Sequence, residues 1–311
     1  MQRAYLGKLL ELAEKDHNVL HILADSGTGF DVMFERNFPD QIVNFGISEE
    51  HMIAAAAGMA TCGKIPFVYT AGAFLAYRAF EFIRDDVCIQ NLNVKIVGMG
   101  SGLSWSSLGP THHTTEDIAV LRSLPNLMIL SPATPRQVMA CVEKAYEREG
   151  PVYIRIGMNN EKEFFDESYD FKISGFDKIS NGRDAIIVSS GSILEQTEKA
   201  SAIISKAGYD VGIWSVNTIK PFKEQFLTDA KEITGILITV EEHQKCGGLG
   251  SIINDAIMEL GIEMKNYRIG LDDTFAYGYG KYADVRKRNG LNAEAIAEKV
   301  ISYLKGSRTN E

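Results

Sequence analysis

Short apolar runs alternate with helical segments along most of the chain. In the first half the expected strands are residues 19–24, 65–69, 94–98, 127–130 and 152–156, and the expected helices lie near 49–61, 73–90, 116–123 and 134–148. Strands that alternate with helices form parallel βαβ units, because each helix returns the chain to the same edge of the sheet. The pattern therefore predicts an α/β fold with mainly parallel sheets.

A second α/β series begins after a polar, acid-rich break in this pattern. Its expected strands are residues 185–189, 211–215 and 236–240, and its expected helices lie near 192–207, 222–232, 249–260 and 292–305. A chain of 311 residues is long enough for two domains with their own cores. We therefore expect two three-layer α/β domains, residues 1–160 and 184–311, joined by a linker over 161–183.

Composition excludes several classes of protein. Apolar residues make up 45% and charged residues 23%, which is typical of a soluble protein. A net charge of −9 without any Lys/Arg run argues against nucleic-acid binding. The four cysteines are far apart without metal-ligand spacing, so we expect them to be reduced. No apolar run reaches the ~20 residues that span a membrane, and no signal peptide is evident, so we expect a cytoplasmic protein.

Residues 46–60 form the most informative segment for function. A short apolar run ends at Phe45, Gly46 turns the chain, and an almost wholly apolar helix follows. Its first turn contains Glu49, Glu50 and His51. So apolar a helix must be buried, and a buried carboxylate is costly without a partner. Either the free N–H groups of the helix N-terminus stabilise the charge, or the acid serves chemistry.

The sequence Gly-Ile-Ser-Glu-Glu-His before a small-residue helix resembles the pyrimidine-binding domain of the transketolase superfamily, whose members use thiamine diphosphate. Further landmarks follow in family order at residues 74–80, 109–112, 123–126, 239–243 and 247–250. Each match is weak, but together they cover nearly the whole chain. The resemblance implies a pyrimidine-binding domain followed by a transketolase C-terminal-like domain, which is the C-terminal half of a full-length transketolase.

The resemblance assigns Glu49 as both catalytic and cofactor-binding. In the family the matching carboxyl group bonds N1′ of the cofactor's aminopyrimidine and favours its imino tautomer. The 4′-amino group then removes the proton at C2 of the thiazolium ring. An apolar, water-poor pocket strengthens such a hydrogen bond. Glu50 is the alternative in register.

Three aromatic residues and one acid are the other expected cofactor contacts. Phe74, Tyr77 and Phe80 recur at three-residue intervals, so a helix would place them along one side. They form either a core stripe or stacking partners for the aminopyrimidine, and the resemblance favours cofactor contact. Asp25, at a strand end, matches a cofactor-proximal acid of the family; an Asx turn is the alternative.

Two residues are expected to bind substrate. His112 follows Gly-Pro-Thr on a loop after a strand, where parallel sheets place their active sites. Histidine suits acid–base work on a hydroxyl, and the family's matching histidine handles the sugar. Arg155 matches a substrate- or phosphate-contacting arginine, although arginines at strand ends are often structural. His113 is expected to support the site without contacting substrate.

Two departures from the family pattern concern the substrate. Leu108 stands where sugar-handling members often have an aspartate that binds a hydroxyl. Gly100 or a neighbour stands where they have a histidine or a basic residue. These losses imply a donor or acceptor that differs from common sugar phosphates, such as a modified or deoxy sugar.

The chain also lacks the family's metal motif, Gly-Asp-Gly followed by Asn, which lies in a separate N-terminal domain. No metal ligand is therefore expected in this chain. The resemblance implies one subunit of a split transketolase, which moves a two-carbon ketol unit from a ketose to an aldose. Thiamine diphosphate would bind between chains, and an N-terminal partner subunit would hold Mg²⁺ or Ca²⁺ in an α2β2 assembly.

Three alternatives stay open at this stage. The first is the β subunit of a 2-oxo acid dehydrogenase decarboxylase component, which has the same domain pair. The second is an enzyme similar to deoxyxylulose-phosphate synthase. The third, of another class, is a non-catalytic assembly subunit that shares only the fold.

Overall fold

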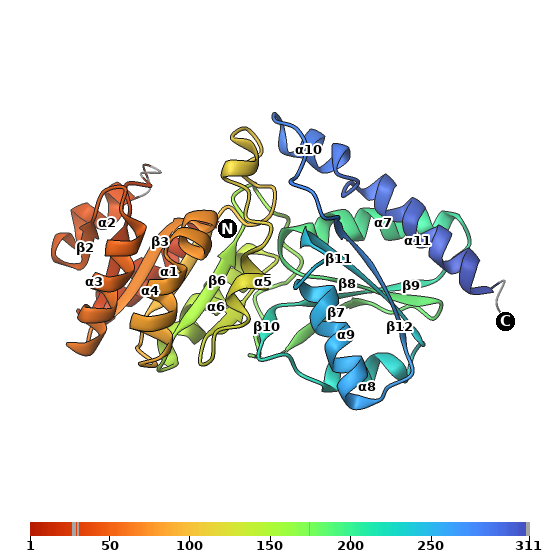
Figure 1. Ribbon diagram of the computed structural model, residues 1–311, viewed down its shortest axis with the longest axis horizontal. Coiled ribbons are helices and arrows are strands. Elements are labelled where there is room, and N and C mark those ends of the chain that lie inside the picture. The colour runs from red at the N-terminus through yellow and green to blue at the C-terminus, as the bar shows by residue number, and fades with distance from the viewer. Residues whose placement is uncertain (27–28, 30, 174, 309–311) are drawn as a thin grey trace.

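The computed structural model describes residues 1–26, 29, 31–173 and 175–308. They form two α/β domains that lie side by side (Figure 1). The first sheet has the strand order β10-β5-β6-β4-β3-β1-β2, and only the pair β10–β5 is antiparallel. Its strands are β1 (Val19–Leu23), β2 (Ile42–Asn44), β3 (Ile65–Ala71), β4 (Lys95–Met99), β5 (Met128–Leu130), β6 (Val152–Ile156) and β10 (Thr218–Lys220).

The second sheet has the order β12-β11-β8-β9-β7, and only the pair β7–β9 is antiparallel. Its strands are β7 (Phe176–Ser180), β8 (Ala185–Ser189), β9 (Val211–Val216), β11 (Ile236–Gln244) and β12 (Lys265–Leu271). The expected α/β fold with mainly parallel sheets is thus confirmed.

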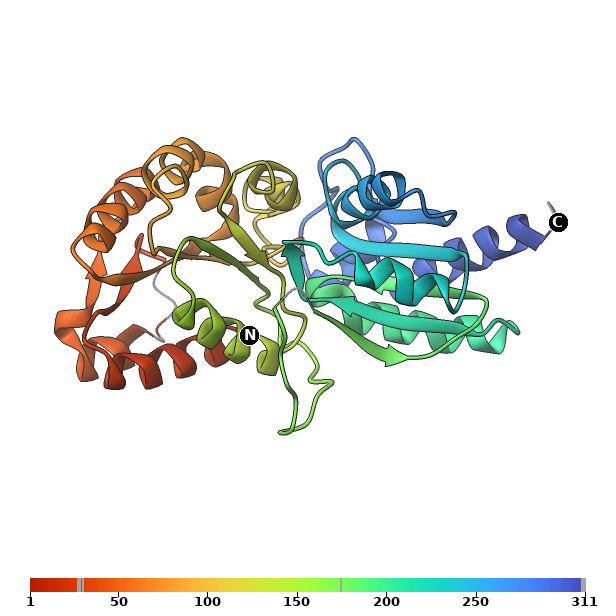
Figure 2. The ribbon, with the colours of Figure 1, turned by 90° about the horizontal axis from the view of Figure 1, so that it is seen from below.

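Helices cover both faces of each sheet (Figure 2). In the first domain they are α1 (Gln2–Lys15), α2 (Asp31–Asn37), α3 (Glu49–Thr61), α4 (Phe80–Phe82), α5 (Asp117–Leu121) and α6 (Pro135–Glu147), with the π-helical turns η2 (Phe74–Arg78) and η3 (Ile83–Cys88) and the 3₁₀ turns η1 (Pro39–Gln41) and η4 (Gly109–Thr111). In the second they are the 3₁₀ turn η5 (Gly191–Ile193) and helices α7 (Leu194–Lys206), α8 (Gln225–Lys231), α9 (Leu249–Leu260), α10 (Tyr282–Arg288) and α11 (Ala293–Arg308).

The linker predicted over 161–183 is shorter in the structure. Residues Phe176–Ser180 form β7 at the edge of the second sheet. This strand is half exposed and polar, so it lacks the apolar run of a central strand. The prediction also missed β10, whose three residues add a strand to the sheet of the first domain. The chain of the second domain therefore helps to build the first.

Glu242 and His243 contact the first domain, whereas Glu241 caps a helix of its own domain. Glu241 accepts hydrogen bonds from the free N–H groups of Leu249 and Gly250 at the start of α9, at 2.7 and 3.1 Å. Glu242 accepts from the N–H of Leu103 in the first domain at 3.2 Å. The sequence suggested no chemistry for this element, and the contacts give it a structural role.

Two further expectations concern the chain as a whole. In the described ranges, no helix is long and apolar enough to cross a membrane. All four cysteines are free thiols, as expected.

Candidate active site

The expected site residues lie after strands at one edge of the first sheet. Parallel pairing brings the carboxyl ends of β1, β2, β3 and β4 to that edge. Gly46 has a φ of +68°, so a glycine is favoured where the chain turns from β2 towards α3. Asp25, Glu49, Phe74 and His112 follow these four strands along the chain.

Glu49 is the buried acid of this edge. It is only 1% exposed at the first turn of α3, whereas Glu50 is half-buried. Its Oε2 accepts a hydrogen bond from Nη1 of Arg78 at 2.5 Å. The guanidinium carbon of Arg78 also lies 4.6 Å from the centre of the Phe74 ring. The buried carboxylate of Glu49 therefore has a cationic partner in addition to the N–H groups of the helix N-terminus.

Phe74 contacts both His112 and Arg78, and Arg78 pairs with Glu49. The two rings meet edge-on with centroids 5.1 Å apart, and the Trp105 ring lies 6.1 Å from the imidazole. Nδ1 of His112 is 2.9 Å from the Thr111 hydroxyl. The loop allows this packing because Gly100 has a φ of +81° and a Cβ there would meet Trp105 at 2.1 Å. The structure thus brings three predicted site residues, Glu49, Phe74 and His112, into one cluster.

Phe74, Tyr77 and Phe80 do not lie on one regular helix, and their contact with the cofactor stays a prediction. Residues Phe74–Arg78 form a π-helical turn, closed by a bond from the N–H of Ala79 to the carbonyl of Phe74 at 3.3 Å. The wider turn shifts the register of side chains that follow it. Tyr77 points to Glu116, with its hydroxyl 2.8 Å from that carboxylate, and Phe80 packs on the hydrophobic core.

Asp25 lies at the edge but is held by its neighbours. It is exposed and has a φ of +49°. Its N–H donates to the side chain of Asn44 at 3.0 Å, and the Asn44 amide donates back to its carboxylate at 3.3 Å. This pair ties the ends of β1 and β2 together.

Arg155 lies in a buried ion pair and does not line the site. It is 3% exposed, and its Nε donates to both oxygens of Asp117, the shorter contact being 2.8 Å. Its Nη2 donates to the carbonyls of Thr114 and Glu242, each at 3.0 Å. Arg155 therefore has a structural role. Its Nε and Nη2 groups bind Asp117 and Thr114 of its own domain and Glu242 of the second domain. We therefore do not retain the predicted substrate contact.

The imidazoles of His113 and His243 are both buried. In the described part of the chain neither ring nitrogen of His113 has a hydrogen-bond partner. His243 uses both nitrogens, because Nδ1 lies 2.7 Å from the carbonyl of Gln244 and Nε2 accepts from the N–H of Ala119 at 3.3 Å. Burial lowers the pKa of both imidazoles, although nearby carboxylates favour the charged form. His243 is therefore a neutral, structural histidine.

Acidification should destabilise the chain through His243. Its folded pKa is lowered, mainly by burial and against the pull of Asp117, so below pH ~6.5 the unfolded state binds a proton that the folded state does not. Relative to a His243→Asn variant, the wild-type free energy of unfolding should fall by up to about 1.4 kcal/mol per pH unit. Urea unfolding between pH 7.5 and 5.5 measures this. The exposed His17→Asn is the control, and equal slopes for all three proteins would contradict the assignment.

Leu108 forms an apolar rim beside His112. It is 43% exposed. The adjacent Gly109 has a φ of +74°, and a Cβ there would meet the Tyr279 ring at 2.1 Å. The N–H of Gly280 also donates to the carbonyl of Ser106 at 3.0 Å. A segment of the second domain therefore supports the loop that presents His112.

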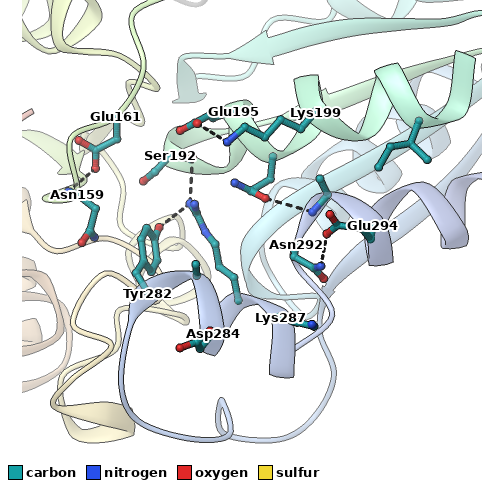
Figure 3. Close-up of a pocket in the computed structure, with 15 residues that line it drawn as sticks. Asn159, Glu161, Ser192, Glu195, Lys199, Tyr282, Asp284, Lys287, Asn292 and Glu294 are labelled. Carbon is teal, nitrogen blue, oxygen red and sulfur yellow. Dashed lines mark hydrogen bonds and ion pairs between the residues drawn. The ribbon is translucent and has the colours of Figure 1, made fainter.

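A polar cleft of about 960 Å³ lies elsewhere, between the domains (Figure 3). None of the predicted site residues lines it. Its polar groups pair with one another: Glu195 with Lys199 at 2.6 Å, and Arg286 with the Tyr282 hydroxyl at 2.6 Å. These four polar groups are paired, and the cleft holds none of the predicted site residues, so the carboxylate cluster remains the candidate site.

The cluster fits the aminopyrimidine of thiamine diphosphate. The Arg78 guanidinium is flat, has N–H donors, lies over Phe74 and donates to Glu49. A pyrimidine protonated at N1′ is likewise flat, cationic and an N–H donor, so it matches the guanidinium in chemistry. Across the described ranges, no group of three or more His, Cys, Asp or Glu side chains could hold a metal ion.

Sequence reasoning missed Arg78 and Trp105. Arg78 lies within the quoted segment 74–80, but nothing in the sequence relates it to Glu49, which is 29 residues away. Trp105 could have been noticed as one of only two tryptophans, in a loop otherwise rich in glycine and serine.

Comparison with known proteins identifies the family. The family model for the transketolase pyrimidine-binding domain matches residues 1–161, and that for the transketolase C-terminal domain matches residues 176–296. A putative transketolase C-terminal section of Methanocaldococcus jannaschii is 33% identical, over 98% of this chain and 96% of that protein. One of the subunits of the apulose-4-phosphate transketolase of Actinobacillus succinogenes is 32% identical over 92% of each chain.

A solved structure agrees with these relatives. It is described as a split gene transketolase, an inactive β4 tetramer. It is 31% identical, has a TM-score of 0.88 and matches 98% of this chain and 97% of its own. With both domain models matched in order, the chain belongs to the transketolase family.

Proposed function

We propose that this chain is the C-terminal subunit of a split, thiamine diphosphate-dependent transketolase. The observation that carries the proposal is the buried Glu49 carboxylate, which is joined to Phe74 through Arg78 and lies on the same sheet edge as His112. A carboxylate 1% exposed is costly unless it has a function or a partner. In thiamine diphosphate enzymes of this family, the matching carboxyl group bonds N1′ of the cofactor's aminopyrimidine.

Each residue of the cluster has a separate task in this proposal. Glu49 bonds N1′ of the aminopyrimidine and shares a proton with it, which gives the 4′-amino group its basic imino form. Phe74 offers a flat apolar face for the ring and keeps water away from the carboxyl. His112 exchanges a proton with a hydroxyl of the sugar, from the loop that Trp105 supports. The cofactor itself supplies the C2 carbanion that accepts the ketol unit.

Of the other predicted cofactor residues, Tyr77 is proposed to contact the cofactor, whereas Phe80 and Asp25 are proposed to support the site. Tyr77 is exposed at the same edge and already fixed by Glu116, so it can shape the pocket wall. Phe80 and Asp25 act through their neighbours in this proposal: Phe80 supports the turn that carries Arg78, and Asp25 fixes the ends of β1 and β2.

The rest of the site belongs to a partner in this proposal. The sequence has no Gly-Asp-Gly motif for the diphosphate metal, so an N-terminal subunit would hold Mg²⁺ or Ca²⁺. Two relatives support a split enzyme by their names, one as a single subunit of a transketolase and the other as a split gene transketolase. We infer an α2β2 assembly, because closed symmetric association is the usual solution for such subunits. We also propose that the complex acts in the cytoplasm.

The substrate is proposed to be a modified sugar or sugar phosphate. An unpaired buried hydroxyl is costly, and Leu108 offers none of the hydrogen bonds that a carboxylate would give. A donor or acceptor without an ordinary hydroxyl near the reacting carbons therefore suits this pocket. The relative named for apulose 4-phosphate supports this direction.

Replacing His112 by alanine tests the proposed site. We expect turnover to fall by about 10²–10⁴-fold, because a positioned acid–base group is lost. Thiamine diphosphate affinity should change little, since Glu49 and Phe74 are kept. The measurement is kcat on the complex of both subunits, with cofactor binding by calorimetry. An exposed histidine, His17→Ala, is the matched control, and parallel loss of affinity and turnover would make His112 a cofactor ligand.

A substrate panel separates the proposal from its alternatives. It pairs modified ketoses with aldose acceptors, and it includes xylulose 5-phosphate with ribose 5-phosphate. Pyruvate with glyceraldehyde 3-phosphate tests synthase activity, and a 2-oxo acid with lipoamide tests a dehydrogenase component. Better efficiency with the common pair than with every modified sugar would refute the substrate proposal. No turnover in any arm would favour a non-catalytic role in assembly.

A further inference from the structure

Arg78 occupies the two surfaces that the proposed function gives to the cofactor. It donates to Oε2 of Glu49 at 2.5 Å, and its guanidinium carbon lies 4.6 Å from the centre of the Phe74 ring. The carboxylate is therefore already paired, and the aromatic face is already covered. An aminopyrimidine that binds Glu49 over the Phe74 ring would meet this guanidinium.

The ion pair also opposes the chemistry expected of Glu49. A cation in contact favours the ionised carboxylate, whereas the proposed role needs a carboxyl that shares a proton with N1′. Arg78 can leave this ion pair, because its side chain is 42% exposed while that of Glu49 is 2% exposed. The arginine can move to solvent, and the acid cannot.

The backbone around Arg78 is suited to such a movement. Arg78 is the last residue of a π-helical turn and is followed by only three residues of α-helix before a second π-helical turn. π-Helical turns are rare and occur frequently at functional sites. The turn aims Arg78 at Glu49 across 29 residues of sequence.

We propose that Arg78 is a latch that closes the aminopyrimidine site in the free chain and leaves Glu49 when the cofactor binds. This inference rests on the proposed function of the same site. In the latched state the guanidinium neutralises the buried carboxylate, which stabilises the chain before assembly. Binding of the aminopyrimidine replaces one donor to Glu49 by another, so its apparent affinity is reduced by the fraction of latched molecules.

Thiamine and thiamine diphosphate together test the latch. An Arg78→Met variant keeps an apolar side chain over Phe74 but cannot pair with Glu49. We expect both ligands to bind the variant about fivefold more tightly than the wild type, on the full chain and on the complex of both subunits. Arg84→Met is the matched control, because Arg84 is exposed, lies in the same broken helix and pairs with Asp85, not with Glu49. It should leave both affinities unchanged.

Comparison of thiamine with thiamine diphosphate distinguishes a latch from a residue that binds the diphosphate. If Arg78→Met weakens thiamine diphosphate but not thiamine, Arg78 contacts the diphosphate, and the latch is refuted. Unchanged or weaker binding of both ligands also refutes it. A wild-type complex that binds neither ligand would instead overturn the proposed function.

Chemical modification gives a second readout that does not depend on affinity. Phenylglyoxal reacts with accessible guanidinium groups, and mass spectrometry locates the product. Saturating thiamine should increase the rate of modification at Arg78 several-fold in the wild-type chain, because the guanidinium leaves Glu49. The rate at Arg84 should stay constant. A lower rate at Arg78 would mean that the ligand buries this arginine, which contradicts release.

Discussion

A Glu49→Gln variant should lose about 10²–10⁴-fold in turnover, because glutamine keeps the shape of the side chain but cannot share a proton with N1′. The burial of Glu49 strengthens the expectation, since water cannot take the place of the carboxyl. Exchange of the C2 proton of bound thiamine diphosphate for deuterium, followed by NMR, measures the step directly. The complex of both subunits is the sample.

Glu50→Gln is the matched control for this prediction. The two glutamates are adjacent in the first turn of α3, but Glu50 is half-buried, and of the two it is Glu49 that pairs with Arg78. Glu50→Gln should therefore cost far less. Near-normal C2 exchange in Glu49→Gln would refute the role of Glu49, and an inactive Glu50→Gln with an active Glu49→Gln would show that the register is wrong.

Periodicity was enough to predict the strands and helices of both domains that have strong apolar patterns. The helix expected near 49–61 is α3 (Glu49–Thr61). The expected helix start at Thr134–Pro135 is confirmed, since the Thr134 hydroxyl accepts from the N–H of Gln137 at 3.2 Å. Weakly patterned elements such as β7 and β10 were missed, because a short or polar strand is stabilised by its neighbours in the sheet.

The site was predictable where it depends on topology and not where it depends on side-chain register. Glu49 and His112 follow strands of one parallel sheet, so their common edge could be inferred. The π-helical turn at residues 74–78 could not be predicted, because no local pattern in the sequence marks the change from α-helical hydrogen bonding. Arg155 lies where the sequence placed it, at a strand end, but Asp117 at the start of α5 pairs with its guanidinium.

The second large effect concerns dependence on a partner subunit. The purified chain alone should bind thiamine diphosphate weakly and have no measurable transferase activity. It offers a carboxylate and an aromatic face for the aminopyrimidine, but the sequence has no Gly-Asp-Gly motif for the diphosphate metal. The related split gene transketolase of known structure is described as an inactive β4 tetramer, which agrees with an incomplete site.

The surface around the site supports docking of another chain there. Four exposed apolar or aromatic residues belong to the segments that carry the site: Ile47 comes two residues before Glu49, Tyr77 precedes Arg78, and Leu108 and Tyr279 flank Gly109 on the loop of His112. Exposed apolar side chains that gather around a site mark an interaction surface more often than a free one. A partner that covers them would also exclude water from the carboxyl.

Adding an N-terminal transketolase subunit with Mg²⁺ should restore both cofactor binding and turnover, and a chelator should abolish them again, because the diphosphate would lose its metal. Sedimentation of the mixture gives the stoichiometry, for which we expect two copies of each chain.

A Leu108→Asp variant should weaken assembly, since it places a charge in the apolar surface, whereas Met258→Asp, at an exposed apolar residue of α9, should not. Robust turnover by this chain alone, at a level that excludes a contaminating enzyme, would refute the split-enzyme proposal, because a complete site would then lie within one kind of subunit.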